Sequence, residues 1–186
     1  MDPVKTQQQY NQAVFDCRQI FEKKLHDYGA AWRILRISSL TDQLLIKARR
    51  IRSLEIKGEH RIGDGVQTEF QAIVNYCIIG LIQWQMGWVE EVDLTPQEAL
   101  TKYDKVVQLA YQLMENKNHD YDEAWRQMRI SSYTDLILTK LLRIKQIEDL
   151  NEKTLISEGI DANYMDILNY AIFALIRLEE SSHGNE

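Results

Sequence analysis

The stretch DYGAAWRILRISSLTDQLLIKARRIRSLE, residues 27–55, decides the fold because it occurs twice. It returns as DYDEAWRQMRISSYTDLILTKLLRIKQIE at residues 120–148, a shift of 93 residues, with 16 of 29 aligned positions identical. The chain is therefore a tandem repeat, and its two halves are expected to share one fold.

Many of the shared residues are polar, which the filling of a core does not require. The identical polar or charged pairs include Asp27/Asp120, Arg33/Arg126, Arg36/Arg129, Ser39/Ser132, Asp42/Asp135, Lys47/Lys140, Arg50/Arg143 and Glu55/Glu148. Two interpretations are open. Either these residues belong to a functional site that is present in both repeats, or they form salt bridges between the repeats.

Composition indicates a helical protein with a proper core. The 186 residues are 45% hydrophobic and 27% charged, with only 8 glycines and 2 prolines, and residues that favour helices fill long segments. We expect an all-α fold. The net charge of -6 argues against strong binding of duplex nucleic acid and leaves a small anionic ligand as the easier partner.

Neither a disulfide nor a membrane span is expected. Cys17 and Cys77 fall on apolar helix faces, where free cysteine behaves as a small hydrophobe. No apolar run approaches the length of a membrane span, and the N-terminus lacks the core of a signal peptide. The expected location is the cytoplasm, and the sequence leaves association into a homo-oligomer open.

Each repeat is expected to contain three helices. The first helix begins at Pro3 or Pro96, the latter inside a Thr95-Pro-Gln-Glu98 capping box, and a short Ala-Trp-Arg turn follows its end. Ser39 and Asp42 suggest a capping box for the second helix, as do Ser132 and Asp135, with ends near Gly58 and Asn151. The third helix is expected after Gly65 or Gly159.

The organisation is therefore two helical repeats that pack as one bundle with pseudo-two-fold symmetry. The predicted boundaries are 1–86 for repeat 1, 87–94 for a linker, 95–180 for repeat 2 and 181–186 for a flexible tail.

Four carboxylates are the candidate metal ligands. Glu55 and Glu148 each end an apolar stripe of the second helix, where a buried acid needs a cation, a metal or a raised pKa. In the third helix Glu69 aligns with Asn163, and Asp166 with Ala72. Each copy thus keeps one acid of an E-x-x-D pair that would suit Mg²⁺. The alternatives are emergence into water, an ion pair or a helix-start acid.

The remaining candidates are weaker acids, cations and aromatic residues. Asp42 and Asp135 are weaker metal candidates, since a position near a helix start explains them. Lys and Arg suit phosphate oxygens, and the candidates are Lys47, Arg50, Lys140, Arg143, Arg36 and Arg129. Aromatic rings suit stacking on a base, although core packing explains them as well; these are Trp32, Trp125, Tyr28 and Tyr121.

The pattern K-x-x-DY-x-x-AW-R, with R-x-S-S-x-TD, K-x-x-RI, E and a later NY, resembles the nucleotide modification associated domain 1 family, present twice. Residues 24–33 and 117–126 carry its first part. The resemblance implies association with nucleotide or base modification systems.

A more distant likeness is to the all-α nucleoside triphosphate pyrophosphatases of the MazG and dimeric dUTPase kind. It implies that Glu69 and Asp166 stand for the Glu and Asp of an E-x-x-D helix that holds Mg²⁺, with Glu55 and Glu148 on the other helix. Asn163 and Ala72 depart from that pattern, and the second helices lack the E-x-x-E partner.

The leading hypothesis is thus a nucleotide-binding protein with Mg²⁺-dependent pyrophosphohydrolase activity on (deoxy)nucleoside triphosphates, in nucleotide metabolism or base modification. No catalytic residue is assigned. The alternative is a non-catalytic helical binding or scaffold module whose repeated polar residues form structural salt bridges.

Overall fold

The computed structural model describes residues 2–58, 62–151 and 159–183. Within these residues the chain forms six α-helices and two short 3₁₀ helices, with no strand, so the all-α prediction is confirmed. In chain order the elements are α1 (Pro3–Tyr28), η1 (Ala31–Ile34), α2 (Ile37–Lys57), α3 (Ile62–Met86), α4 (Pro96–Tyr121), η2 (Ala124–Gln127), α5 (Ile130–Asp149) and α6 (Ile160–His183).

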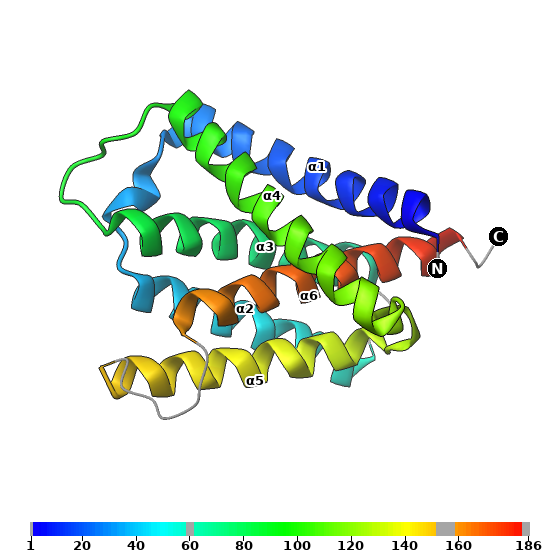
Figure 1. Ribbon diagram of the computed structural model, residues 1–186. Helices are drawn as coiled ribbons and strands as arrows, with labels where there is room; N and C mark the ends of the chain where they lie inside the picture. Colours follow the sequence, from blue (N-terminus) through cyan, green and yellow to red (C-terminus); the bar gives the residue numbers. More distant parts are fainter. Residues whose placement is uncertain (1, 59–61, 152–158, 184–186) are drawn as a thin grey trace.

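The helices form three layers, and each layer contains the equivalent helix of both repeats. Figure 1 shows α1 beside α4, α3 beside α6, and α2 beside α5. The middle pair, α3 and α6, is the most apolar and contacts both outer layers. Helices that are far apart in sequence thus pack on their counterparts, as pseudo-two-fold symmetry requires.

Two buried amides join the repeats across the core. Asn75 accepts a hydrogen bond from the Tyr103 hydroxyl at 2.8 Å and donates to a carbonyl of α1. Asn169 repeats this arrangement, accepting from the Tyr10 hydroxyl at 2.8 Å and donating to a carbonyl of α4. The Asn of each NY pair therefore donates within its own repeat and accepts from a tyrosine of the other repeat, so that its buried polar groups are satisfied.

The helix starts agree with the sequence only in part. Thr95 and Glu98 form the predicted capping box, with bonds of 3.2 and 2.8 Å. The capping boxes predicted at Ser39 and Ser132 are wrong. The N-caps of α2 and α5 lie three residues earlier, at Arg36 and Arg129, and neither of these residues makes a side-chain cap.

Other boundaries shift by a few residues. The ends near Gly58 and Asn151 are confirmed, and α6 begins after Gly159 as predicted, but α3 begins at Ile62 instead of after Gly65. The segment 87–95 joins the repeats. The predicted tail is helical up to His183, and residues 184–186 of that prediction lie outside the described residues.

Both cysteines are free and buried, as predicted. Among the described residues, none of the helices combines the length and the apolar character that a crossing of the bilayer requires.

Candidate functional site

The helices α2 and α5 run antiparallel and make reciprocal contacts that contain two of the predicted metal ligands. Glu55 accepts a hydrogen bond from the Thr134 hydroxyl at 2.7 Å, and Glu148 accepts one from the Thr41 hydroxyl at 2.9 Å. Thr41 also lies 2.7 Å from the Tyr164 hydroxyl. Both glutamates therefore join one repeat to the other.

The weaker metal candidates lie in the same interface, nearer to solvent. Asp42 pairs with Lys145 at 2.5 Å, and Asp135 pairs with Arg52 at 2.7 Å. The two pairs occupy equivalent positions, one at each end of the helix pair. Such exposed pairs contribute about 1 kcal/mol or less to stability. Their main effect is therefore to align α2 and α5 relative to each other.

Burial raises the pKa of both Glu55 and Glu148, and the threonine hydrogen bonds offset only part of this effect. When folding raises the pKa of a carboxyl, its protonated form contributes to the stability of the folded protein. This stabilisation is complete at pH values below the unfolded-state pKa. That stabilisation is lost as the pH rises through the folded-state pKa. At neutral pH the two ionised glutamates therefore reduce the free energy of unfolding.

We expect the double variant Glu55→Gln/Glu148→Gln to be more stable than the natural protein at pH 7, because an uncharged amide still accepts the threonine hydrogen bond. The gain is expected to shrink as the pH falls toward 4. Urea denaturation at several pH values measures it. Glu91→Gln, on the surface, is the control and is expected to change nothing. A loss of stability at pH 7 in the double variant would contradict the assignment.

Glu69 of α3 is buried and held by two cations of α2. Its carboxylate lies 2.8 Å from Arg50 Nη1 and 3.7 Å from Lys47 Nζ. The second distance is too long for a hydrogen bond, so Glu69 Oε2 is a buried acceptor without a hydrogen-bond partner within the described residues. Lys47 also lies over the Tyr76 ring, 5.4 Å from its centroid.

Asp166 of α6 is held by two lysines from two different helices. Lys117 Nζ of α4 lies 2.7 Å from Oδ1, and Lys140 Nζ of α5 lies 2.8 Å from Oδ2. Burial alone would raise the pKa of Asp166, but the two lysine hydrogen bonds outweigh it, and the pKa lies below its ordinary value. Asp166 is therefore an ionised carboxylate with its charge fully compensated.

The four predicted metal ligands do not converge where the chain is described. Glu55 and Glu148 lie in the interface of α2 with α5, Glu69 contacts α2, and Asp166 contacts α4 and α5. No group of three His, Cys, Asp or Glu side chains in these regions is placed to hold a metal ion.

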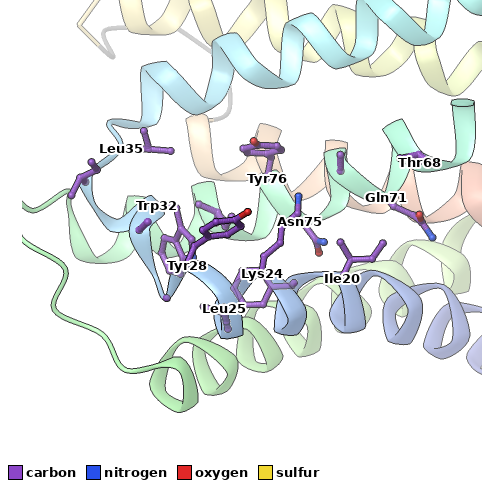
Figure 2. Close-up of a pocket in the computed structure, with 16 residues that line it drawn as sticks. Ile20, Lys24, Leu25, Tyr28, Trp32, Leu35, Thr68, Gln71, Asn75 and Tyr76 are labelled. Atoms are coloured by element: carbon purple, nitrogen blue, oxygen red, sulfur yellow. The ribbon is translucent and has the colours of Figure 1, made fainter.

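A pocket of about 440 Å³ opens between α1, η1 and α3, and we call it the repeat 1 pocket. Figure 2 shows Trp32 and Tyr28 together at one end, Gln71 and Thr68 toward the other, and Lys24 extending from α1 toward α3. Its wall is mostly apolar and aromatic, and its lining residues also include Ile20, Phe21, Leu25, Leu35, Ala72, Asn75, Tyr76 and Ile79. Its volume falls in the usual range for small-molecule sites.

The equivalent place in the second half is smaller, and we call it the repeat 2 pocket. It has a volume of about 290 Å³. The positions match one for one, with Lys117, Tyr121, Trp125, Asp166, Asn169, Tyr170 and Phe173 in place of Lys24, Tyr28, Trp32, Ala72, Asn75, Tyr76 and Ile79. Both repeats therefore carry a pocket, and its contents differ between them.

The predicted stacking residues all lie at these pockets, but they differ in solvent exposure and in the rings that they contact. Tyr28 is 75% exposed and Tyr121 71%. Trp32 is only partly buried and tilts toward Phe21, with ring centroids 6.2 Å apart. Trp125 is 7% exposed and stacks on Phe173, with centroids 4.3 Å apart and planes at 7°. A ring that enters from solvent would find its stacking place on Trp125 taken.

The indole N–H groups of Trp32 and Trp125 share a further property. Both are buried, and neither has a hydrogen-bond partner within the described parts of the chain. An unsatisfied buried donor costs about 1–3 kcal/mol. Each pocket is therefore lined by a tryptophan whose donor the fold leaves unused.

The predicted phosphate ligands divide into two groups. Lys47, Arg50 and Lys140 lie at the buried acids just described. Arg36, Arg129 and Arg143 are exposed; Arg36 lies over the Trp88 ring, 5.5 Å from its centroid. Within residues 2–58, 62–151 and 159–183 no carboxylate pairs with these three arginines. The alternative interpretation, in which the repeated polar residues form salt bridges between the repeats, therefore does not hold for them there, although Asp42 and Asp135 do form such bridges.

The sequence interpretation missed two residues that define the pockets, Lys24 and Lys117. Lys117 pairs with Asp166, whereas Lys24 is exposed at the mouth of the repeat 1 pocket, and no carboxylate of the described residues pairs with it. The signal was present, because the two lysines are identical at the shift of 93 residues.

Comparison with known proteins identifies the chain at the level of its family. The family described as nucleotide modification associated domain 1 matches residues 24–84 and again residues 117–178, together well over half of the chain. Each match runs from the pocket lysine into the last helix of its repeat. No curated protein and no solved structure matches the chain significantly. The protein therefore belongs to the nucleotide modification associated domain 1 family and carries two copies of that domain in tandem.

Proposed function

We propose that the protein binds a nucleotide in the repeat 1 pocket. The observation that carries the proposal is Lys24, a cation with no carboxylate partner among the described residues, at the mouth of an aromatic pocket of about 440 Å³. A nucleotide joins a flat apolar base to an anionic phosphate. The family name points to the same class of molecule.

The pocket offers a separate environment to each part of the ligand. Trp32 and Tyr28 supply aromatic surface for a base at one end. Lys24 supplies a point charge for a phosphate, and Lys47, which is half-buried over the Tyr76 ring and 3.7 Å from Glu69, is a second cation beside the wall of the pocket. Hydrogen bonds between ions are about twice as strong as neutral ones, so the lysines would dominate the affinity.

Hydrolysis of a nucleoside triphosphate remains a prediction beyond binding. Glu69 and Asp166 each pair with two cations, and within the described residues neither belongs to a group of three His, Cys, Asp or Glu side chains placed for a metal ion. No step of the proposal uses the metal. Release of pyrophosphate from deoxynucleoside triphosphates in the presence of Mg²⁺ is the measurement for this activity.

We expect Lys24→Met to weaken nucleotide binding at least about tenfold, the loss that one charge-assisted hydrogen bond implies. The measurement is isothermal titration with each of the four deoxynucleoside 5′-monophosphates and triphosphates, with and without Mg²⁺. Lys23→Met is the matched control, because Lys23 is an exposed neighbour on the same helix that does not line the pocket.

The natural protein is expected to bind a nucleotide, and Lys23→Met to bind it equally well. Absence of heat with all the nucleotides would overturn the proposal and favour the predicted alternative, a scaffold without a ligand. Equal affinity in Lys24→Met and the natural protein would also overturn it, because the pocket would then not be the binding place.

A further inference from the structure

The two pockets differ at the position that faces the lysines. In repeat 2 the carboxylate of Asp166 lies within 2.8 Å of both Lys117 and Lys140. In repeat 1 the equivalent residue is Ala72, whose methyl group lines the pocket and offers no charge to Lys24. In repeat 2 both lysines face the carboxylate of Asp166. In repeat 1 Lys24 faces no carboxylate from this position, and Lys47, the counterpart of Lys140, lies 3.7 Å from Glu69 instead.

The pockets differ again at the position that faces the tryptophan. Phe173 stacks on Trp125, with planes at 7° and centroids 4.3 Å apart. Its counterpart in repeat 1 is Ile79, which is aliphatic, so no ring of α3 stacks on Trp32 from this position. An aromatic ring covers the indole in one repeat, and the same place is left to a smaller side chain in the other.

We infer that Asp166 and Phe173 occupy, in repeat 2, the places that the phosphate and the base of a nucleotide take in repeat 1. This inference rests on the proposed function and adds the number of sites and the shape of the ligand. One chain binds one nucleotide, in repeat 1, and repeat 2 carries a copy of the site filled by its own side chains.

The spacing of the two filling residues describes the ligand. Asp166 and Phe173 are seven residues apart on α6, about two turns, which places their backbones about 10 Å apart along the helix. The ligand is therefore an elongated molecule with an aromatic ring at one end and an anion at the other. A deoxynucleoside 5′-phosphate in an extended conformation has this shape, whereas inorganic phosphate lacks the ring.

The difference in volume agrees with this interpretation. Two larger side chains on α6 accompany a reduction from about 440 to about 290 Å³. The lysines of repeat 2 also have a partner already, because each donates a short hydrogen bond to Asp166, at 2.7 and 2.8 Å. A ligand anion that entered repeat 2 would have to displace that carboxylate and its two short hydrogen bonds.

The test is the stoichiometry of binding in isothermal titration with each of the four deoxynucleoside 5′-monophosphates. The natural protein is expected to bind one molecule per chain. Ala72→Asp, which puts into repeat 1 the carboxylate that repeat 2 already has, is expected to lose binding at least tenfold and to keep its helical circular dichroism. Ala72→Asn has the same size without the charge and is expected to lose less than Ala72→Asp.

The reverse variant, Asp166→Ala/Phe173→Ile, is expected to raise the stoichiometry from one to two. Two sites in the natural protein, or full binding by Ala72→Asp, would overturn the inference while leaving the proposed function intact. A stoichiometry of one in a folded double variant would overturn it as well. If the double variant does not fold, Ala72→Asp decides. Absence of binding by the natural protein would instead overturn the proposed function.

Discussion

Gly80→Ala is expected to destabilise the protein by at least about 2 kcal/mol, at the upper end of the usual cost of overpacking. A Cβ at Gly80 would lie 2.3 Å from Cε1 and 2.8 Å from Cδ1 of the Tyr164 ring. The ring is buried, and its hydroxyl lies 2.7 Å from that of Thr41. It therefore cannot move away without breaking the contact between α6 and Thr41 of α2.

Gly80→Ala is expected to lower the free energy of unfolding, whereas a glycine-to-alanine change inside a helix usually raises it. Alanine normally stabilises a helix interior by about 1 kcal/mol relative to glycine, so a net loss reports on the close approach of α3 to α6. Gly65→Ala in the same helix is the matched control, because its Cβ would meet only Leu54 Cδ1, at 3.4 Å. That variant is expected to be neutral or more stable.

Chemical denaturation of the two alanine variants measures both effects. A double-mutant cycle with Tyr164→Leu adds a direct check on the cause, because Gly80→Ala should cost much less once the ring is gone. If Gly80→Ala proved as stable as the natural protein, the packing of the two central helices described above would be wrong.

Arg33→Met is expected to cost about 3 kcal/mol or more, as loss of one partner from a buried charged network does. Arg33 is 1% exposed, and its guanidinium donates to Asp93 at 2.8 and 3.1 Å, to the Gly87 carbonyl at 2.7 Å and to the Gln83 side chain. Gln83 in turn donates to three carbonyls around η1. Methionine would leave several of these groups unsatisfied.

The arginine fixes the wall of the repeat 1 pocket, so binding should suffer together with stability. Trp32 and Ile34 flank Arg33 in the 3₁₀ helix, and both line the pocket. Thermal unfolding and nucleotide titration measure the two effects. Asp93→Asn changes only the partner nearer to solvent and is expected to cost much less than Arg33→Met. Similar losses of stability in Arg33→Met and Asp93→Asn would contradict the assignment of Arg33 as the buried centre of this hydrogen-bond network.

The fold was predictable because its signals lie within short segments of the sequence and occur in both repeats. Spacing of apolar residues gives three helices per repeat, and the Thr95 box and the two prolines give helix starts. The misplaced starts of α2 and α5 have a physical reason. Ser39 and Ser132 resemble caps in sequence, but the extended backbone at Arg36 and Arg129 begins each helix without a side-chain cap.

The partners of the polar residues were not predictable from helical phase. Glu55 and Glu148 were expected to need a cation, a metal or a raised pKa; the pKa of both is raised, and the threonine of the other repeat that donates a hydrogen bond to each was not foreseen. Which helix lies opposite is decided by tertiary packing, and a single sequence does not contain that choice in readable form.

Part of the candidate site was predictable from the sequence. The unequal acids of the third helices were recognised as the place where the copies diverge, and Asp166 does lie in a pocket. Its lysine partners come from α4 and α5, so only the structure shows that its charge is compensated. The same comparison shows why Lys24 matters, since its counterpart already holds a carboxylate.

The most direct test of the central claim is the response of the tryptophan indole N–H signals to a nucleotide in ¹⁵N NMR spectra. The chain has four tryptophans, which single Trp→Phe variants assign. On titration with deoxynucleoside 5′-monophosphates the Trp32 signal should shift and saturate at one molecule per chain, while the Trp125 signal stays in place. A shift of Trp125 without Trp32, or no shift of either, would contradict binding in the repeat 1 pocket.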